Sequence, residues 1–342
     1  MKEKRFLILV VMALLTIAAC GGGAPSTVVL PIITSENAGS LTNINAKNKT
    51  GGAIIWLSDG SSIAMVGDRE ISILDTLTFQ EEQHFTSASK LYQTLAISPT
   101  GDQVAIIVDD FTKVEIWNID PPKLHMTLGD DEEIVFVNIA TFSPDGNSLA
   151  MGGWGEDCAM VILWDLHTGK VIEKIAIDQV KPAYNRAIFN LAFSPDGAGW
   201  SAIACDGSLF VHYASMSFWT IGDGGKEQGA ALAFSRDGDL LAVGGGSLAH
   251  NLRVYDISTI YPEVIFDLKE PKGIVKNVSF NADGSILAAT LNGDVCLWDV
   301  NTGEQLSQLD IAAYSVAFSP DGTLLATIGM RDGLGMWAVA EP

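Results

Sequence analysis

Short apolar runs separated by polar turns fill the chain from about residue 40 to its end. Typical runs are residues 191–193 and 324–327, and few stretches repeat apolar residues at the 3.6-residue spacing of a helix. Runs of this length bounded by Gly, Asp and Asn predict β-strands. Many are apolar at successive positions, as expected for strands of small sheets that neighbours cover on both faces. The pattern therefore predicts an all-β protein.

A turn motif of the form Phe-Ser-Pro-Asp-Gly recurs seven times between these runs. Its proline pre-sets the backbone, aspartate suits the third position, and glycine accepts a positive φ at the exit. The spacings between successive glycines are 41, 45, 51, 41, 46 and 38 residues, and a period of this size indicates a repeat fold. The glycines are Gly60, Gly101, Gly146, Gly197, Gly238, Gly284 and Gly322.

Each repeat contains four predicted strands. One strand precedes the turn and one follows it, a third ends near an aromatic residue, and a fourth follows a turn such as His167-Thr168-Gly169. In six repeats the third strand ends near an aromatic residue: Trp117, Trp164, Tyr213, Tyr255, Trp298 and Trp337. The fixed place of these aromatic residues in the repeat favours packing within a blade over a ladder for stacking ligands. Seven units of four antiparallel strands predict a seven-bladed β-propeller.

The array resembles the WD40 family over residues 40–342. Asp165, Asp256 and Asp299 follow the third-strand aromatic residue, as in the family's aromatic-Asp pair, although no Gly-His dipeptide precedes any repeat. The resemblance implies a non-catalytic platform that docks a protein or peptide.

The last repeat stops one strand short. The chain ends at Pro342, just after the third strand of the seventh copy, and residues 40–46 precede the first copy as a spare strand. Pairing this segment beside the strand that ends at Trp337 would close the ring through both ends of the chain. Closure would also cover an edge that a linear array leaves exposed.

The N-terminus resembles the signal peptide of bacterial lipoproteins. Lys2, Lys4 and Arg5 precede a 14-residue apolar run, residues 6–19, which suits a signal-peptide core better than a membrane span. The run ends in Ile-Ala-Ala before Cys20, which resembles a lipobox and implies lipidation of Cys20. We expect a signal peptide at residues 1–19, a lipidated N-terminus and flexible tether at 20–39, and the propeller at 40–342. The protein would be exported and anchored to the bacterial cell membrane or outer membrane, with the propeller outside the cytoplasm.

Acidic residues outnumber basic ones. The chain has 41 Asp and Glu against 20 Lys and Arg, for a formal charge of −21. Such a surface repels phosphate backbones, which argues against nucleic acid as a partner, and it would suit a basic protein or peptide. Solubility alone also explains the charge. We expect a monomer.

No motif indicates catalysis, a metal or a cofactor. The five histidines are scattered and no two stand at metal-ligand spacing, and nucleophile elbows and phosphate or dinucleotide loops are absent. The acidic run at residues 130–133 lacks the alternation and central glycine of an EF-type calcium loop. After Cys20, three cysteines remain. Cys158 and Cys205 stand near loops of adjacent blades, so either a bridge between them or small buried side chains are possible.

The loops joining second to third strands, and each blade to the next, are expected to share one face. In the WD40 family this face is the usual docking surface. Phe111 and Trp154 are candidate aromatic anchors there, although each could instead fold over its own blade. The other candidates are Arg69, Asp109, Asp110, Asp130, Asp131, Tyr184, Arg186, Lys226, His250, Lys272 and Arg331. Alternatives to a docking scaffold are an envelope assembly factor for membrane proteins, and an enzyme or small-ligand receptor that uses the central channel.

Overall fold

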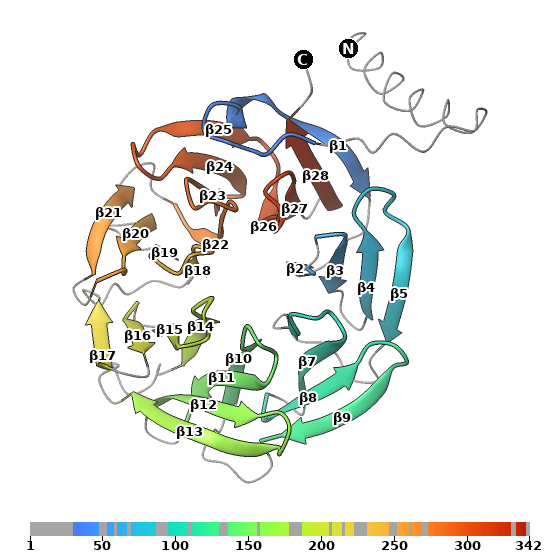
Figure 1. Cartoon of the computed structure of the whole chain (residues 1–342), viewed down its shortest axis with the longest axis vertical. Helices are drawn as coiled ribbons and strands as arrows, with labels where there is room; N and C mark the ends of the chain where they lie inside the picture. Colours follow the sequence, from blue (N-terminus) through green and yellow to red (C-terminus); the bar gives the residue numbers. More distant parts are fainter. Residues whose placement is uncertain are drawn as a thin grey trace. The chain divides into compact units, whose positions relative to one another are not determined.

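Seven four-stranded antiparallel sheets stand around a common axis in the computed structural model (Figure 1). The prediction of a seven-bladed propeller is confirmed. The structure describes residues 30–47, 53–57, 60–66, 70–86, 95–108, 111–129, 136–155, 158–177, 187–204, 207–213, 216–221, 231–245, 252–259, 262–268, 273–329 and 333–339.

The blades follow one another along the chain. Blades 1 to 6 are β2–β5, β6–β9, β10–β13, β14–β17, β18–β21 and β22–β25, and blade 7 combines β26–β28 with β1. The strands of the first four blades are β2 (Ala53–Trp56), β3 (Ser62–Val66), β4 (Glu70–Asp75), β5 (Glu81–Thr86), β6 (Leu95–Ile97), β7 (Gln103–Val108), β8 (Lys113–Asn118), β9 (Lys123–Leu128), β10 (Phe136–Phe142), β11 (Ser148–Trp154), β12 (Ala159–Asp165), β13 (Lys170–Ile177), β14 (Ile188–Phe193), β15 (Gly199–Ala204), β16 (Leu209–Tyr213) and β17 (Met216–Ile221). The others are β18 (Ala231–Phe234), β19 (Leu240–Gly244), β20 (Leu252–Asp256), β21 (Glu263–Leu268), β22 (Val275–Phe280), β23 (Ile286–Leu291), β24 (Asp294–Asp299), β25 (Gln305–Leu309), β26 (Ala313–Phe318), β27 (Leu325–Gly329), β28 (Gly333–Val339) and β1 (Leu41–Lys47), which follows the 3₁₀ turn η1 (Ala38–Ser40).

Burial changes with the position of a strand in its blade. The second strands β15 and β23 are buried at every position, whereas the outermost strands β9 and β13 are mostly exposed. This explains why many strands are apolar at successive positions: both faces of the sheet meet a neighbouring blade.

The hydrophobic cores lie between blades. One cluster joins Ile107 and Ile116 of blade 2 to Leu149 and Ile162 of blade 3, and similar clusters join other successive pairs. The third-strand residues Trp164, Tyr255 and Trp298 are all buried. Blade packing is therefore confirmed as the role of these three.

Each Ser-Pro-Asp-Gly turn is held by its own side chains. In blade 4 the buried Ser194 hydroxyl accepts the Gly199 N–H at 2.9 Å and donates to the Asp196 carboxylate at 2.6 Å. Ser143, Ser235 and Ser319 make the same pair of bonds. Serine in this motif therefore starts the second strand by capping its first N–H.

The turn glycines also pack against the preceding blade. A Cβ added to Gly146 would lie 3.6 Å from Pro99, and one added to Gly197 would lie 3.6 Å from Pro144. Gly197 also has φ +70°, which favours glycine over other residues. The motif thus forms the turn and fits it against its neighbour in the ring.

We expect Ser194→Ala to destabilise the protein by about 1–3 kcal/mol, because it leaves the buried Gly199 N–H without its acceptor. Urea unfolding followed by tryptophan fluorescence measures the change. Ser258→Ala, in an exposed turn, is the matched control and should cost much less. Equal midpoints for both variants would contradict this role of Ser194.

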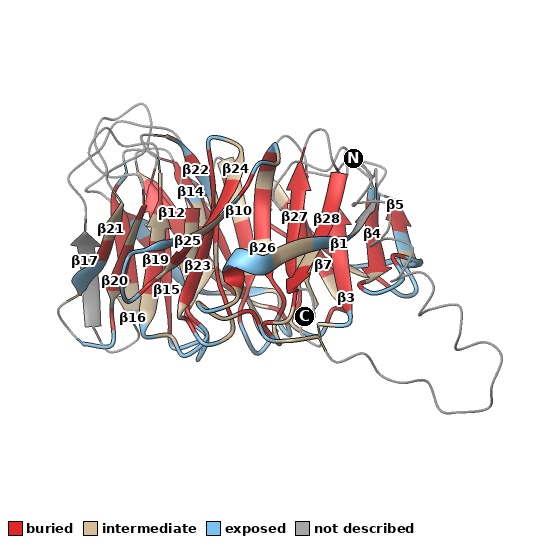
Figure 2. Ribbon diagram, turned by 90° about the horizontal axis from the view of Figure 1, so that it is seen from above, coloured by how far each residue is buried: buried red, intermediate tan, exposed pale blue. Residues whose placement is uncertain are grey.

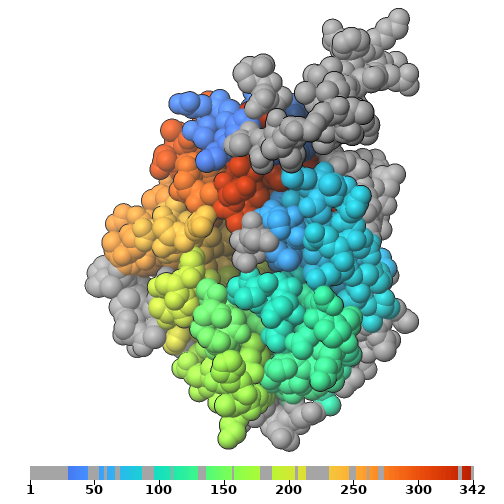
Figure 3. Space-filling model, turned by 45° about the vertical axis from the view of Figure 1, so that its right-hand side comes forward, coloured from blue at the N-terminus to red at the C-terminus, as the bar shows by residue number. Residues whose placement is uncertain are grey.

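The N-terminal strand closes the ring. β1 pairs antiparallel with β28, with Leu41 opposite Val339 and Thr42 opposite Ala338. Figure 3 shows the blue N-terminal residues lying against the red C-terminal strands. The predicted pairing of residues 40–46 beside the strand of Trp337 is confirmed, with β1 one residue later than expected.

The propeller begins before residue 40. Ile33 is fully buried, its N–H donates to the Gly322 carbonyl at 2.9 Å, and the Asn281 side chain donates to its carbonyl at 3.4 Å. Ala38 is also fully buried, in the cluster between blades 6 and 7. Residues 32–39, which we placed in the flexible tether, therefore pack on the turns of those blades. The predicted signal peptide, Cys20 and the rest of the tether up to residue 29 lie outside the described residues.

Candidate protein-docking face

The antiparallel blades give the ring two unlike faces. Turns that follow the first and third strands lie on one face, here called the turn face. Loops that follow the second and fourth strands lie on the other, here called the loop face. The strands run from one face to the other (Figure 2).

The turn face uses its carboxylates internally. Asp165 accepts the backbone N–H and hydroxyl of Thr168 at 2.7 and 2.9 Å, and Asp299 holds Thr302 in the same way. These bonds close the turns between third and fourth strands. The aspartate of each aromatic-Asp pair is thus a turn residue.

The same bonds lower the pKa values of several carboxyl groups. The Ser143 hydroxyl and then the Asn147 N–H lower the pKa of Asp145, and the Thr168 N–H and hydroxyl lower the pKa of Asp165. For Asp283 and Asp321 burial is the largest influence and raises the pKa, yet the combined hydrogen bonds lower it overall. The pKa values of Asp75, Asp102, Asp196 and Asp256 are also lowered.

Stability should therefore fall in acid. A carboxyl group whose pKa is lower in the folded state stabilises the fold above its unfolded pKa, here 3.8, and loses that contribution as pH falls through the folded value. We expect the urea midpoint to be nearly constant from about pH 7 to 5 and to drop below about pH 4. A midpoint that rises below pH 4 would contradict this electrostatic account.

An aromatic cluster lies on the loop face at blades 2 and 3. Phe111 stacks on Phe136 with ring centroids 4.6 Å apart and planes 20° apart. Phe136 meets Trp154 at 5.8 Å and 74°. Trp154 is 37% exposed, while Phe111 and Phe136 are half-buried. The two predicted anchors therefore share a contact with a third aromatic ring.

The backbone fixes this cluster. Phe136 and Trp154 are cross-strand partners in β10 and β11, and the Phe111 carbonyl accepts the Val137 N–H at 2.6 Å. Gly153 allows the strands to approach, because an added Cβ would lie 1.9 Å from the Phe136 carbonyl oxygen. Phe136 was missed from the sequence. Its position as the first residue of an innermost strand, ten residues before Gly146, was the available signal.

The remaining predicted docking residues lie outside the described residues. They are Arg69, Asp109, Asp110, Asp130, Asp131, Tyr184, Arg186, Lys226, His250, Lys272 and Arg331. Their place on the loop face stays a prediction.

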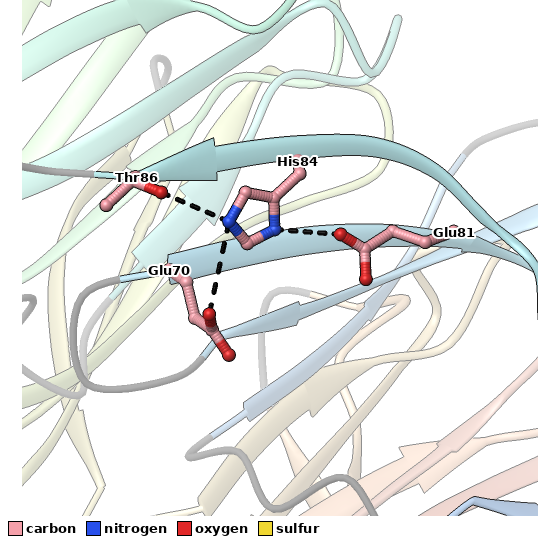
Figure 4. Close-up of polar contacts among 4 residues, drawn as sticks. All are labelled: Glu70, Glu81, His84 and Thr86. Atoms are coloured by element: carbon pink, nitrogen blue, oxygen red, sulfur yellow. Dashed lines mark hydrogen bonds and ion pairs between the residues drawn. The ribbon is translucent and has the colours of Figure 1, made fainter.

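His84 has three polar neighbours. On β5, its Nδ1 lies 2.8 Å from Glu81, and its Nε2 lies 3.1 Å from the Thr86 hydroxyl and 4.0 Å from Glu70 (Figure 4). The Thr86 hydroxyl, the His84 imidazole and the Glu81 carboxylate lie in the spatial order of a nucleophile, a base and the carboxylate that orients the base. However, the His84 side chain is 43% exposed on the outermost strand of blade 1, so water reaches the group freely. We interpret it as a surface network across β4 and β5.

The described part of the chain has no cluster of metal-ligating side chains. Within it, no three His, Cys, Asp or Glu side chains are grouped closely enough to hold a metal ion. Cys296 is buried between blades 5 and 6, and burial, followed by the charges of Asp294 and Asp310, raises its pKa to about 11. It is thus a small apolar core residue. Cys205 is not described, so a bridge to Cys158 and small buried side chains remain the two alternatives. The helical residues that the structure describes include no segment long and apolar enough to cross a bilayer.

Comparison with known families supports the repeat assignment. Residues 263–299 match the family model described as WD domain, G-beta repeat. This segment spans β21, the outermost strand of blade 5, and β22–β24 of blade 6. The chain is a seven-bladed β-propeller with a WD40 repeat at residues 263–299. The matched repeat therefore starts with the outermost strand of one blade and continues with the three inner strands of the next blade. In the same way, β1 comes first in the chain and is the outermost strand of the last blade.

Similar proteins and structures agree with the fold. The chain is 23% identical over 239 residues to Periodic tryptophan protein 2 homolog of Schizosaccharomyces pombe, a match that covers 69% of this chain and 24% of that protein. It is 25% identical over 203 residues to Protein LST8 homolog of Drosophila melanogaster, covering 56% of this chain and 60% of the relative. The Cps50 (Swd1) β-propeller domain of Myceliophteria thermophila superposes with a TM-score of 0.70 at 18% identity, covering 88% of this chain and all of that domain. The chain thus spans about a quarter of the first relative's length.

Proposed function

We propose that this WD40 propeller is a non-catalytic docking scaffold that binds a partner protein through its loop face. WD40 propellers typically serve as protein-interaction scaffolds. The observation that supports this use of the loop face is the Phe111–Phe136–Trp154 cluster, because exposed aromatic side chains are common anchors of protein interfaces. On the turn face, by contrast, the aspartates hold their own turns.

A photo-crosslinking amino acid placed on each face tests the proposal in cells. At position 189, an exposed phenylalanine at the start of β14 on the loop face, it leaves Trp154 in place and should capture one discrete partner. At position 77, a leucine that is 70% exposed in the turn between β4 and β5, it should capture none. Equal capture from both positions, or capture from position 77 alone, would contradict the assignment of the docking face.

The proposal includes export and a lipid anchor at Cys20. The apolar run followed by Ile-Ala-Ala-Cys supports it. Several acyl chains on one residue give durable attachment, since each buried CH₂ contributes about 0.8 kcal/mol. The anchor would hold the propeller outside the cytoplasm, at the cell membrane or an outer membrane.

Cys20→Ser is expected to block lipidation, so the protein should leave the membrane fraction or accumulate as uncleaved precursor. Membrane fractionation and intact-mass analysis measure both effects. Cys296→Ala is the control, because it removes a thiol without touching the N-terminus or placing a polar group in the core. A mature wild-type protein with no acyl mass on Cys20 would refute the anchor.

A further inference from the structure

The cluster of Phe111, Phe136 and Trp154, here called the aromatic corner, has a defined shape. Phe111 and Phe136 form a stack with an interplanar angle of 20°, and the Trp154 ring stands at 74° to Phe136. Two aromatic planes that meet near a right angle can turn two ring faces toward the same small group. Trp154 is the most exposed of the three.

The backbone at Phe111 is strained. Its φ is +73°, in the left-handed region that non-glycine residues rarely adopt. This conformation is held by the hydrogen bond from Val137, which connects blade 2 to the first strand of blade 3. Strained residues that the surrounding structure holds in place occur preferentially at functional sites.

Acidic residues flank each member of the corner in the sequence. Asp109 and Asp110 directly precede Phe111, the acidic run 130–133 precedes Phe136, and Glu156 and Asp157 follow Trp154 after one glycine. Lys113 is the one lysine or arginine within residues 109–113, 130–136 and 154–158, which together contain eight Asp and Glu. The chain around the corner is therefore locally anionic, on a protein that already carries a formal charge of −21.

We propose that the aromatic corner binds an arginine or lysine side chain from a basic segment of the partner protein. The ring faces attract the cation through their quadrupoles, and the acidic residues next to the corner in the sequence add charge complementarity. An apolar partner segment would gain nothing from the acids, and an acidic segment would be repelled. This inference rests on the proposed docking function and specifies the chemistry of the partner.

Binding of two labelled peptides to the purified full chain tests the inference. One peptide is tetra-arginine and the other is tetra-citrulline, which keeps the shape of arginine but lacks its charge. Fluorescence anisotropy in dilute salt should show binding of tetra-arginine at least about tenfold tighter than tetra-citrulline, with affinity falling as salt rises. Equal binding of the two peptides, or no binding of tetra-arginine, would overturn the proposal.

Three variants separate the corner from the general charge of the protein. Trp154→Leu should weaken tetra-arginine binding about tenfold, whereas Trp154→Phe should weaken it less than about threefold because it keeps an aromatic face. Phe189→Leu is the matched control, since this phenylalanine is 44% exposed at the start of β14 in the next blade, and it should leave the affinity unchanged. Unfolding midpoints show that each variant is folded. Unchanged binding by Trp154→Leu would overturn the site, and if the crosslinker at position 189 still captured a partner, the docking function would stand without it.

Discussion

A chain that begins at Asn48 should lose several kcal/mol of stability and aggregate, whereas one that begins at Ile32 should behave like the wild type. The first truncation removes β1 and leaves the edge of β28 unpaired. At about 1 kcal/mol for each lost hydrogen bond, added to the burial of Leu41 and Ile33, the cost is a large share of a typical 5–15 kcal/mol. Urea midpoints and light scattering measure the two effects.

A chain that begins at Leu41 separates the strand from the segment before it. It keeps β1 but lacks the buried Ile33 and Ala38, so its midpoint should lie between the other two. If the chains beginning at Leu41 and Ile32 had equal stability, the packing of residues 32–40 would contribute nothing. If the chains beginning at Asn48 and Ile32 had equal stability, closure by β1 would be refuted.

Trp298→Ala should destabilise the protein by about 3–5 kcal/mol. The ring is 1% exposed in the core between blades 5 and 6 and lies 6.4 Å from Phe266. Removing it leaves a cavity that two blades share, and close-packed strands relax only partly into such a space. Equilibrium unfolding in urea measures the loss.

Trp154→Ala is the comparison within the same chain. Its ring is 37% exposed, so its removal should cost about 1 kcal/mol, mainly through the lost contact with Phe136. Comparable losses in the two variants would mean that Trp154 is a core residue, and the docking face would lose its main anchor.

The fold could be predicted because one local motif repeats. Ser194, Asp196 and Gly197 form their turn mainly through bonds to one another and to the next strand, so the sequence carries the geometry without long-range information. The aromatic residue at the end of the third strand keeps its place in six of the seven repeats, which identifies it as a packing residue. Ring closure followed from counting strands.

Two features depend on contacts between distant residues and were missed. Ile33 lies in a stretch rich in Ser, Thr and Pro, and only its bonds to Gly322 and Asn281 show that it belongs to the propeller. Phe136 resembles any apolar residue that starts a strand, and only its neighbours Phe111 and Trp154 make it part of a site. Local patterns cannot carry such information, since the partners come from different blades or different ends of the chain.

Hydrogen exchange of the intact chain tests the central claim, a ring sealed by its N-terminal strand. Amides paired with β28, within residues 41–47, should exchange as slowly as those of the buried strand β27, because they open only when the blade opens. Mass spectrometry of peptic peptides resolves both segments. Exchange of residues 41–47 at the rate of an unstructured chain, with β27 protected, would contradict the closed ring.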